Sequence, residues 1–336
     1  MKTRIFLPAF LLFGLNILSA QEDVHALIVK GVELHDAGKY QEALLEYEKA
    51  QKLDPSSMQV VYEIGYTHNA LGNYKTAIKN ADKVLKAGGE FLLEAYLLKA
   101  NSLDDAGQFK KAIQVFEQAI KRFPDEHLLH FNLGVTQYKQ GMYKEAETAL
   151  QNSILLNLSH ASSHYLMGSL QLEHGGRVQG IMSLYLFLFL EPDSDRSADA
   201  FTWLWNAIHR GVEKEDDANY QINLDASAME SEFSPAEMAL SMLAVTAMTE
   251  GDSGPSDEAF FAEVTDQLFS ILGEQQADKE GFWWDVYVDL FAAVQANGHA
   301  EAFAYYVSQA KGEAVVQWLE ENEEKLNAFS EWLDEY

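Results

Sequence analysis

The fold is decided by a stretch at Leu27–Pro55, LIVKGVELHDAGKYQEALLEYEKAQKLDP, and by its counterpart at Tyr96–Pro124, YLLKANSLDDAGQFKKAIQVFEQAIKRFP. On each side of a central glycine, apolar residues recur at three- and four-residue spacing, which is typical of an amphipathic helix. Glycine tolerates the left-handed conformation that ends a helix, and proline stops the second helix because it cannot continue the hydrogen-bond ladder. Each stretch therefore predicts a hairpin of two helices.

The same pattern occurs five times between residues 24 and 194. A small residue stands seven positions before each central glycine and lets the backbones of neighbouring helices approach closely. The central glycines are spaced by 34 or 35 residues and are Gly38, Gly72, Gly107, Gly141 and Gly175. A period of this length is typical of repeat proteins in which each hairpin packs on the next.

This pattern resembles the tetratricopeptide repeat. The resemblance implies an all-α fold, with an α-solenoid of five tetratricopeptide-type helical hairpins over residues 21–194 and a helical C-terminal domain at 195–336. The expected units are 24–57, 58–92, 93–126, 127–160 and 161–194.

Some positions depart from the family pattern. Lys30 and Lys99 occupy a slot where the family prefers a large aliphatic residue, although a lysine stem can still pack while its ammonium group reaches water. His130 and His164 replace the first large apolar residue of their units. Gly88-Gly89 replaces the closing proline of the second unit, which predicts a local kink.

In this family the first helix of each unit lines a concave surface, where partners usually bind. The outward positions of these helices are mainly apolar and aromatic here, which is expected of a groove that binds a peptide. The predicted partner-binding residues are Ile28, Val32, Tyr62, Tyr66, Asn69, Leu97, Asn101, Phe131, Val135, Tyr138 and Tyr165. These rows contain no Lys or Arg, which excludes the family's mode of gripping a terminal carboxylate with paired Lys and Asn. The alternatives are that the protein's own C-terminal segment or a second copy covers them.

Residues 1–20 have the three parts of a secretory signal peptide. Lys2 and Arg4 give a positive start, Ile5–Leu18 is almost wholly apolar, and Leu18-Ser19-Ala20 resembles a cleavage site. The apolar stretch is shorter than the about 20 residues that a spanning helix needs. The sequence therefore predicts cleavage after Ala20, no membrane span in the mature chain, and export to a bacterial periplasm, with secretion as the alternative.

The charge of the chain excludes several function classes. The sequence holds 24 basic and 52 acidic residues, a net charge of −28. Binding to nucleic acid depends on Lys and Arg that neutralise phosphates, so no nucleic-acid partner is expected. Residues 195–336 hold 30 of the acidic and 6 of the basic residues, so the acidity lies mainly in the C-terminal third. This shift in charge supports a domain boundary near residue 195.

The 34-residue pattern fades after Asp195, but helices are still expected. Ile181–Leu190 is apolar on every face, which predicts burial at the junction with the C-terminal region. Lys214–Ser231 is polar and acidic and predicts a loop. Helices are expected at Ala198–Arg210, Ser234–Glu250, Ser256–Gly273, Gly281–Ala296, Ala300–Ala310 and Glu313–Trp332. The region is interpreted as a separate helical cap, with decayed repeats as the alternative.

Residue patterns that indicate catalysis or metal binding are weak. The sequence has no phosphate-binding glycine loop, no nucleophile elbow and no cysteine. His160 and His164 could present two imidazoles to a metal, but no third ligand lies nearby in the sequence. Asp193–Asp199 alternates oxygen-bearing side chains without the glycine and glutamate of a calcium loop. We therefore expect no catalytic residues, no metal, no cofactor and no enzymatic activity.

The leading hypothesis is an exported protein–protein interaction module or scaffold that binds a peptide or protein on the concave face of the repeats. One alternative is an accessory or enzyme of cell-envelope polysaccharide processing that grips sugar around Trp283 and Trp284. Another is a self-assembling structural component, for which the partner would be a second copy of the chain.

Overall fold

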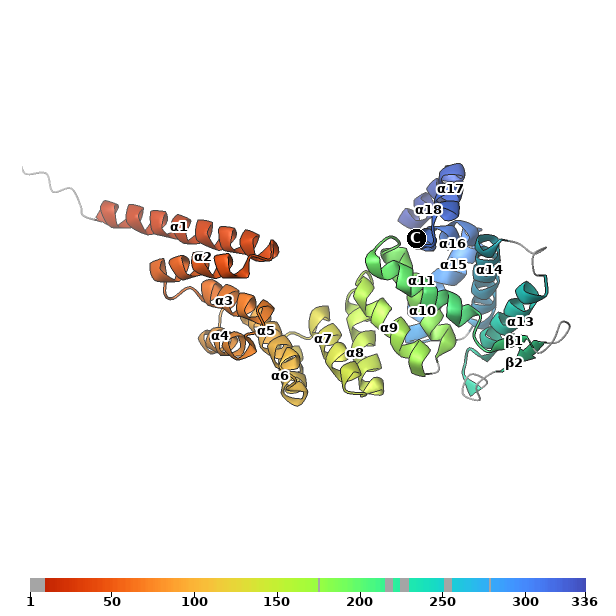
Figure 1. The fold of residues 1–336 in the computed structure, drawn as a ribbon, viewed down its shortest axis with the longest axis horizontal. Coiled ribbons are helices and arrows are strands. Elements are labelled where there is room, and N and C mark those ends of the chain that lie inside the picture. Colours follow the sequence, from red (N-terminus) through yellow and green to blue (C-terminus); the bar gives the residue numbers. More distant parts are fainter. Residues whose placement is uncertain (1–9, 175, 215–219, 224–229, 251–255, 278) are drawn as a thin grey trace, which may run out of the picture. The chain divides into compact units, whose positions relative to one another are not determined.

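The computed structural model describes residues 10–174, 176–214, 220–223, 230–250, 256–277 and 279–336, and most of them are helical (Figure 1). Packing divides the chain into two compact units, Met1–Met142 and Tyr143–Tyr336, which are treated separately as unit 1 and unit 2. This division lies within the fourth expected repeat and does not coincide with the expected boundary near residue 195. The last repeat hairpin therefore packs with the C-terminal region.

In its described part, unit 1 consists of helices that alternate as first and second members of hairpins. They are α1 (Phe10–Asp36), α2 (Tyr40–Leu53), α3 (Met58–Ala70), α4 (Tyr74–Ala87), α5 (Leu92–Asp105), α6 (Phe109–Arg122) and α7 (His127–Lys139). The central glycines Gly38, Gly72, Gly107 and Gly141 have φ between 71° and 74°, so each ends a first helix in the left-handed conformation, as predicted. Gly175 lies outside the described residues. Helix α1 begins inside the predicted signal peptide and continues into the first repeat.

The small residues of the first helices are required by close packing. A Cβ atom on Gly31 would lie 2.3 Å from Cε1 of Tyr47, which is fully buried in α2. A Cβ atom on Gly65 would lie 2.9 Å from both Cβ of Asn80 and Cδ2 of Leu98. The recurrent small position is therefore the point at which a first helix meets its neighbours.

The first helices of unit 1 form a continuous row. In addition to the packing within each hairpin, α1 contacts α3, α3 contacts α5, and α5 contacts α7. Among the described residues, α2, α4 and α6 do not pack comparably on one another. A stack whose first helices lie closer together than its second helices curves toward the first helices. The first helices therefore line the inner face of unit 1, and the second helices form its outer face.

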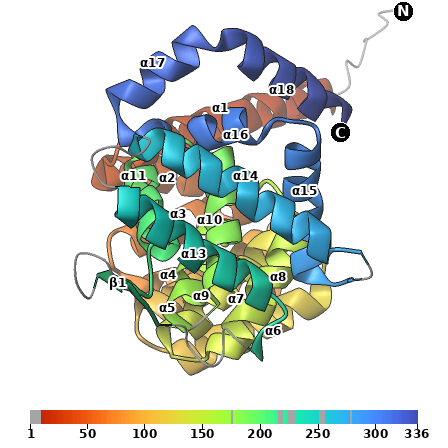
Figure 2. The same cartoon turned by 90° about the vertical axis from the view of Figure 1, so that its right-hand side faces the viewer.

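Unit 2 begins with one repeat helix and one repeat hairpin and continues into a helical assembly. Its described α-helices are α8 (Tyr143–Leu156), α9 (Ala161–His174), α10 (Arg177–Leu190), α11 (Asp195–Ile208), α13 (Ser234–Glu250), α14 (Asp257–Gln275), α15 (Asp289–Ala296), α16 (Ala300–Val307), α17 (Glu313–Glu321) and α18 (Glu323–Glu335). A π-helical turn, η2 (Trp284–Val288), precedes α15, and a 3-10 turn, η3 (Gln309–Lys311), follows α16. Helices α13 and α14 lie side by side (Figure 2).

Helix α10 forms the centre of the core of unit 2. Every residue from Arg177 to Leu188 is buried except Gln179, and the helix contacts α9, α11, α13, α16 and η2. Tyr185 is fully buried among aromatic rings of α14, α15 and α16. The predicted burial of this all-apolar helix against the C-terminal region is confirmed.

Two expectations for the C-terminal region were wrong in detail. The expected loop at Lys214–Ser231 contains part of an antiparallel pair, β1 (Val212–Lys214) and β2 (Tyr220–Ile222), with Glu213 opposite Gln221. The expected helix at Glu313–Trp332 is broken at Asn322 into α17 and α18. Within the described part of the chain, no helix combines the length and apolarity needed to cross a membrane.

Candidate functional site

The predicted binding positions of unit 1 lie on its first helices. Most are half-buried, namely Val32, Tyr62, Asn69, Leu97, Asn101, Phe131, Val135 and Tyr138. Tyr66 is the most open of the set, with 46% of its surface exposed. Half-buried side chains are held by their neighbours and still present a surface, which suits a binding face.

Ile28 is the exception among these positions. It is only 4% exposed and belongs to the core cluster that includes Tyr47 of α2 and Val60 of α3. Because α1, α2 and α3 meet around this side chain, it contributes to packing and is not available to a partner. The sequence-based assignment of Ile28 to the binding surface is corrected accordingly.

Stacked aromatic rings follow the inner face from α1 to the start of α5. The ring of His35 lies 4.8 Å from that of Tyr66, Tyr66 lies 5.9 Å from Tyr62, and Tyr62 lies 6.2 Å from Phe91. The planes within each pair are inclined by 14–25°. We call His35, Tyr66, Tyr62 and Phe91 the aromatic ladder. Each stacked pair contributes about 0.5–1.5 kcal/mol to stability beyond the effect of burying its apolar surface. The rings are therefore held in place before a partner binds.

The start of the aromatic ladder is fixed by contacts of His35. Its Nδ1 atom lies 2.9 Å from Oγ1 of Thr67, and its ring meets the edge of Tyr40 at 5.0 Å. Burial lowers the pKa of His35 from its ordinary value, against the opposing effect of the Asp36 charge. The imidazole is therefore neutral at neutral pH, and this end of the ladder carries no charge.

Polar side chains occupy the row beside the aromatic ladder. The side chain of Asn69 accepts a hydrogen bond from Ser102 at 2.6 Å and donates one to Asp105 at 3.1 Å. Asp104 accepts a hydrogen bond from Lys139 through Oδ2 at 2.6 Å, and its side chain is only 8% exposed. Its other oxygen, Oδ1, is buried and has no hydrogen-bond partner among the described residues. This row therefore holds one buried acceptor that is unsatisfied within the described chain.

In unit 2, the predicted residue Tyr165 lies on α9 and is held by other aromatic residues. Its ring lies 4.9 Å from Phe187 and 5.2 Å from Trp203, and the guanidinium of Arg196 lies 5.5 Å from its centroid. Trp203 and Arg196 both belong to α11, which follows the repeats. Tyr165 is therefore half-buried by a helix that the repeat pattern does not include.

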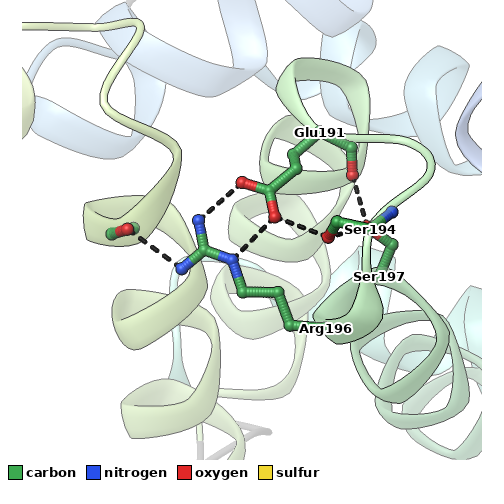
Figure 3. Close-up of polar contacts among 5 residues, drawn as sticks. Glu191, Ser194, Arg196 and Ser197 are labelled. Atoms are coloured by element: carbon green, nitrogen blue, oxygen red, sulfur yellow. Dashed lines mark hydrogen bonds and ion pairs between the residues drawn. The ribbon is translucent and has the colours of Figure 1, made fainter. Parts of the chain in front are cut away.

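Arg196 also organises the start of α11 (Figure 3). Its guanidinium forms an ion pair with Glu191 and donates a hydrogen bond to Ser162 at 2.9 Å. Ser194 and Ser197 form a capping box at the helix start. The hydrogen bonds from Arg196 lower the pKa of Glu191.

Next to Tyr165, a hollow of about 610 Å³ lies between α9 and α11. Ser169 and Leu172 line it from α9, Trp203 and Asn206 line it from α11, and Arg210 lines it from the turn that follows α11. Arg210 donates a hydrogen bond to the backbone oxygen of Leu172 at 2.7 Å. The repeat rows contain no Lys or Arg, but the turn after α11 brings an arginine beside α9.

Trp284, proposed for a sugar site, and His164, proposed for a metal site, have structural roles. Trp284 is 2% exposed, and its ring stacks on Phe233 at 4.8 Å while Nε1 donates to Glu232 at 2.6 Å. Trp284 is thus not accessible to a sugar. His164 is fully buried, with its ring nitrogens 2.8 Å from the Tyr287 hydroxyl and 2.9 Å from the Leu158 carbonyl. Within the described residues, no three metal-ligating side chains come together.

Sequence reasoning missed part of this face. Phe91 precedes α5 in the turn after Gly88-Gly89, which both have positive φ. The expected kink at these glycines was the available signal, but it did not show that the following aromatic residue would stack on Tyr62. Trp203 and Arg210 were missed because they lie beyond the last recognisable repeat.

Stacked helical hairpins with a partly exposed aromatic inner face define a class of repeat proteins that act as protein–protein interaction modules. A family model described as TPR repeat matches residues 31–72, and a model described as anaphase-promoting complex, cyclosome, subunit 3 matches residues 70–153. Together these matches support a protein of the tetratricopeptide repeat type.

Known proteins resemble this chain over part of its length. Anaphase-promoting complex subunit 7 of Homo sapiens is 23% identical over 176 residues, which are 52% of this chain and 31% of that protein. The chain thus spans about a third of the length of this curated relative. The structure of pilF of Pseudomonas aeruginosa has a TM-score of 0.50 at 16% identity and covers 74% of this chain and 99% of its own. A thermophilic TPR protein of Thermus thermophilus has a TM-score of 0.47 at 20% identity and covers 55% and 98%.

Proposed function

We propose that the inner face of unit 1 binds a segment of a protein partner and that the protein serves as a non-enzymatic scaffold. The observation that carries this proposal is the aromatic ladder, which is ordered by stacking and leaves Tyr66 46% exposed. Rigid aromatic side chains lose little conformational entropy when a partner binds, so more of their contact energy becomes affinity.

The same face indicates the chemistry of the partner segment. Aromatic anchors at the centre of an interface contribute most of its binding energy, so the partner should place apolar side chains against Tyr62 and Tyr66. Oδ1 of Asp104 is a buried acceptor without a donor in the described chain. Because this oxygen is buried, it is not offered to a partner, and recognition rests on the accessible aromatic rings.

Site-specific photo-crosslinking tests this proposal. A benzophenone side chain replaces Tyr66 on the inner face or, as the matched control, Leu45, which is 57% exposed on α2. We expect discrete protein adducts from position 66 in the native host and no such adducts from position 45. Adducts that are absent at position 66, or identical at both positions, would contradict binding at the inner face.

We further propose that the chain is exported, to a bacterial periplasm rather than to the medium, after cleavage at Ala20. The support is the charged, apolar and small-residue pattern of residues 1–20. Mass spectrometry of the protein from fractionated cells should give a chain that begins at Gln21 in the periplasmic fraction. A full-length chain that retains Met1 in the cytoplasmic fraction would refute export.

A further inference from the structure

The outer side of unit 1 carries a groove that the proposed function does not use. It has a volume of about 850 Å³ and lies among the first turns of α4, the second half of α5 and the first half of α6. Ile78, Leu103 and Val115 give it apolar walls, and Asn73 and Gln114 are among its amide groups. The groove exists because α4 and α6 do not pack closely on each other.

Three lysines line this groove and no carboxylate does, so we call it the lysine groove, defined by Lys75, Lys99 and Lys111. The helices on its two sides are also basic. Helices α4 and α6 together present eight exposed basic residues and two acidic ones, in a chain whose net charge is −28. The basic residues are Lys75, Lys79, Lys83, Lys86, Lys110, Lys111, Lys121 and Arg122.

Lys99, which lines the groove, is one of the positions that depart from the repeat pattern. It occupies the slot where the repeat family prefers a large aliphatic residue, and its side chain is 27% exposed. Its ammonium group lies 2.7 Å from Oδ1 of Asp82, which is half exposed. An aliphatic side chain would leave this wall of the groove without a cation, whereas Lys99 places an ammonium group there, paired with Asp82.

The chain itself contains a surface of the opposite charge. The terminal hairpin of unit 2, formed by α17 and α18 and called here the acidic hairpin, carries eight acidic residues and one lysine over residues 313–336. All eight are exposed, namely Glu313, Glu320, Glu321, Glu323, Glu324, Glu331, Asp334 and Glu335. Val316, with 45% of its surface exposed, adds an apolar contact on the same hairpin.

We propose that the lysine groove of one copy binds the acidic hairpin of a second copy. The pairing joins two different surfaces, so it is a head-to-tail contact that can add further copies. At about 0.1 M salt, charges interact over about 10 Å, so the groove responds to the local hairpin and not to the net charge of the whole partner. Complementary charge of this kind raises the association rate and selects one partner surface over others.

Charge reversal on each surface, followed by mixing, tests the proposal with the full mature chain. Lys75→Glu with Lys111→Glu reverses the groove without touching the Lys99–Asp82 pair. Glu320→Lys, Glu321→Lys, Glu324→Lys and Glu331→Lys together leave four acidic residues and five lysines over residues 313–336, which reverses the hairpin. Sedimentation velocity over a concentration series should show self-association of the natural chain that weakens as salt rises from about 0.05 to about 0.5 M. The groove variant alone and the hairpin variant alone should each raise the dissociation constant at least about tenfold.

Mixing the groove variant with the hairpin variant is the decisive step, because the reversed groove then meets a reversed hairpin of opposite charge. We expect the mixture to associate through this one restored contact. Lys52→Glu with Lys144→Glu is the matched control, since both lysines are exposed and lie outside the groove. A natural chain that stays monomeric at every concentration, a groove variant that associates like the control, or a mixture that remains monomeric would overturn the proposal.

Discussion

At the scale of single residues, His164 shows how a departure from the repeat pattern is accommodated. The family places a large apolar side chain in this slot, whereas this chain places an imidazole that is fully buried. Both ring nitrogens are hydrogen-bonded, to the Tyr287 hydroxyl and the Leu158 carbonyl, so the ring is satisfied without a charge. The histidine therefore ties α9 to η2 in a way that an aliphatic residue could not.

The pH dependence of stability should report this burial. Desolvation lowers the pKa of His164 to about 4, below its ordinary value of 6.5. The folded state therefore favours the neutral ring. The contribution of His164 to the stability of the fold is fully present above pH 6.5 and is lost as the pH falls toward 4. Between pH 7 and pH 5, this residue should account for a loss of about 2 kcal/mol in the free energy of unfolding.

Urea unfolding of the natural chain and of His164→Leu at both pH values measures this effect. The leucine variant restores the apolar residue of the family pattern and removes the titrating group, so its stability should fall less between pH 7 and pH 5. Equal losses in the two proteins would show that His164 does not titrate as described.

The binding residues were only partly predictable at this scale. The repeat spacing places Tyr62, Tyr66 and Asn69 on first helices, and the structure brings them side by side. The stacking of His35 and Phe91 onto these tyrosines depends on the packing of successive hairpins, which residue spacing alone does not determine. The burial of Ile28 was missed for the same reason, since it arises where three helices meet.

At the scale of elements, a buried ion network joins α10, α11 and α13. Arg177 donates hydrogen bonds to the carbonyls of Ala207 and Ile208 at 2.8 Å, and so satisfies the end of α11. It also donates to Ser241 at 3.0 Å and lies 3.6 Å from Glu237, which accepts a hydrogen bond from the backbone of Val178. One buried guanidinium therefore connects three helices.

Arg177→Met should destabilise unit 2 by about 3–5 kcal/mol, because it removes the cation that lies 3.6 Å from the buried carboxylate of Glu237. The double variant Arg177→Met with Glu237→Met removes both charges and should recover a large part of this loss. Unfolding in guanidinium chloride, followed by tryptophan fluorescence, compares the variants, since the tryptophans all lie after residue 200. A single variant as stable as the natural chain, or no recovery in the double variant, would contradict this role.

Helices were predictable where the pattern is long and periodic, as in the hairpins from α2 to α9. The strands β1 and β2 are three residues each, too short for an alternating pattern to be recognised. The π-helical turn at Trp284–Val288 accommodates Trp284 and Tyr287, both buried, and its geometry follows from packing rather than from local preference. The break at Asn322 has no proline or glycine to mark it.

At the scale of the whole molecule, charge and aromatic residues are distributed among distinct surfaces. Unit 1 has an aromatic inner face and a basic outer groove, whereas the acidic residues concentrate in the C-terminal region. The acidic region and the repeat rows could be predicted from the sequence, because the first follows from counting charged residues and the second from the spacing of the repeats. The lysine groove became visible only when α4, α5 and α6 were placed together.

The central claim is that the inner face of unit 1 binds polypeptide, and one measurement tests it most directly. Peptides are selected from a random display library with the full mature chain, and their dissociation constants are measured by fluorescence anisotropy. The test variant is Tyr62→Ser, Tyr66→Ser and Phe131→Ser combined, and the control is Leu45→Ser, Leu53→Ser and Leu155→Ser, all exposed and away from this face.

We predict that the test variant keeps the helical circular dichroism of the natural chain and binds the selected peptides at least about 30-fold more weakly, which corresponds to about 2 kcal/mol. The control variant should bind them as the natural chain does. Peptides that bind the test variant with unchanged affinity, while its helicity is intact, would contradict the assignment of the inner face as the binding surface.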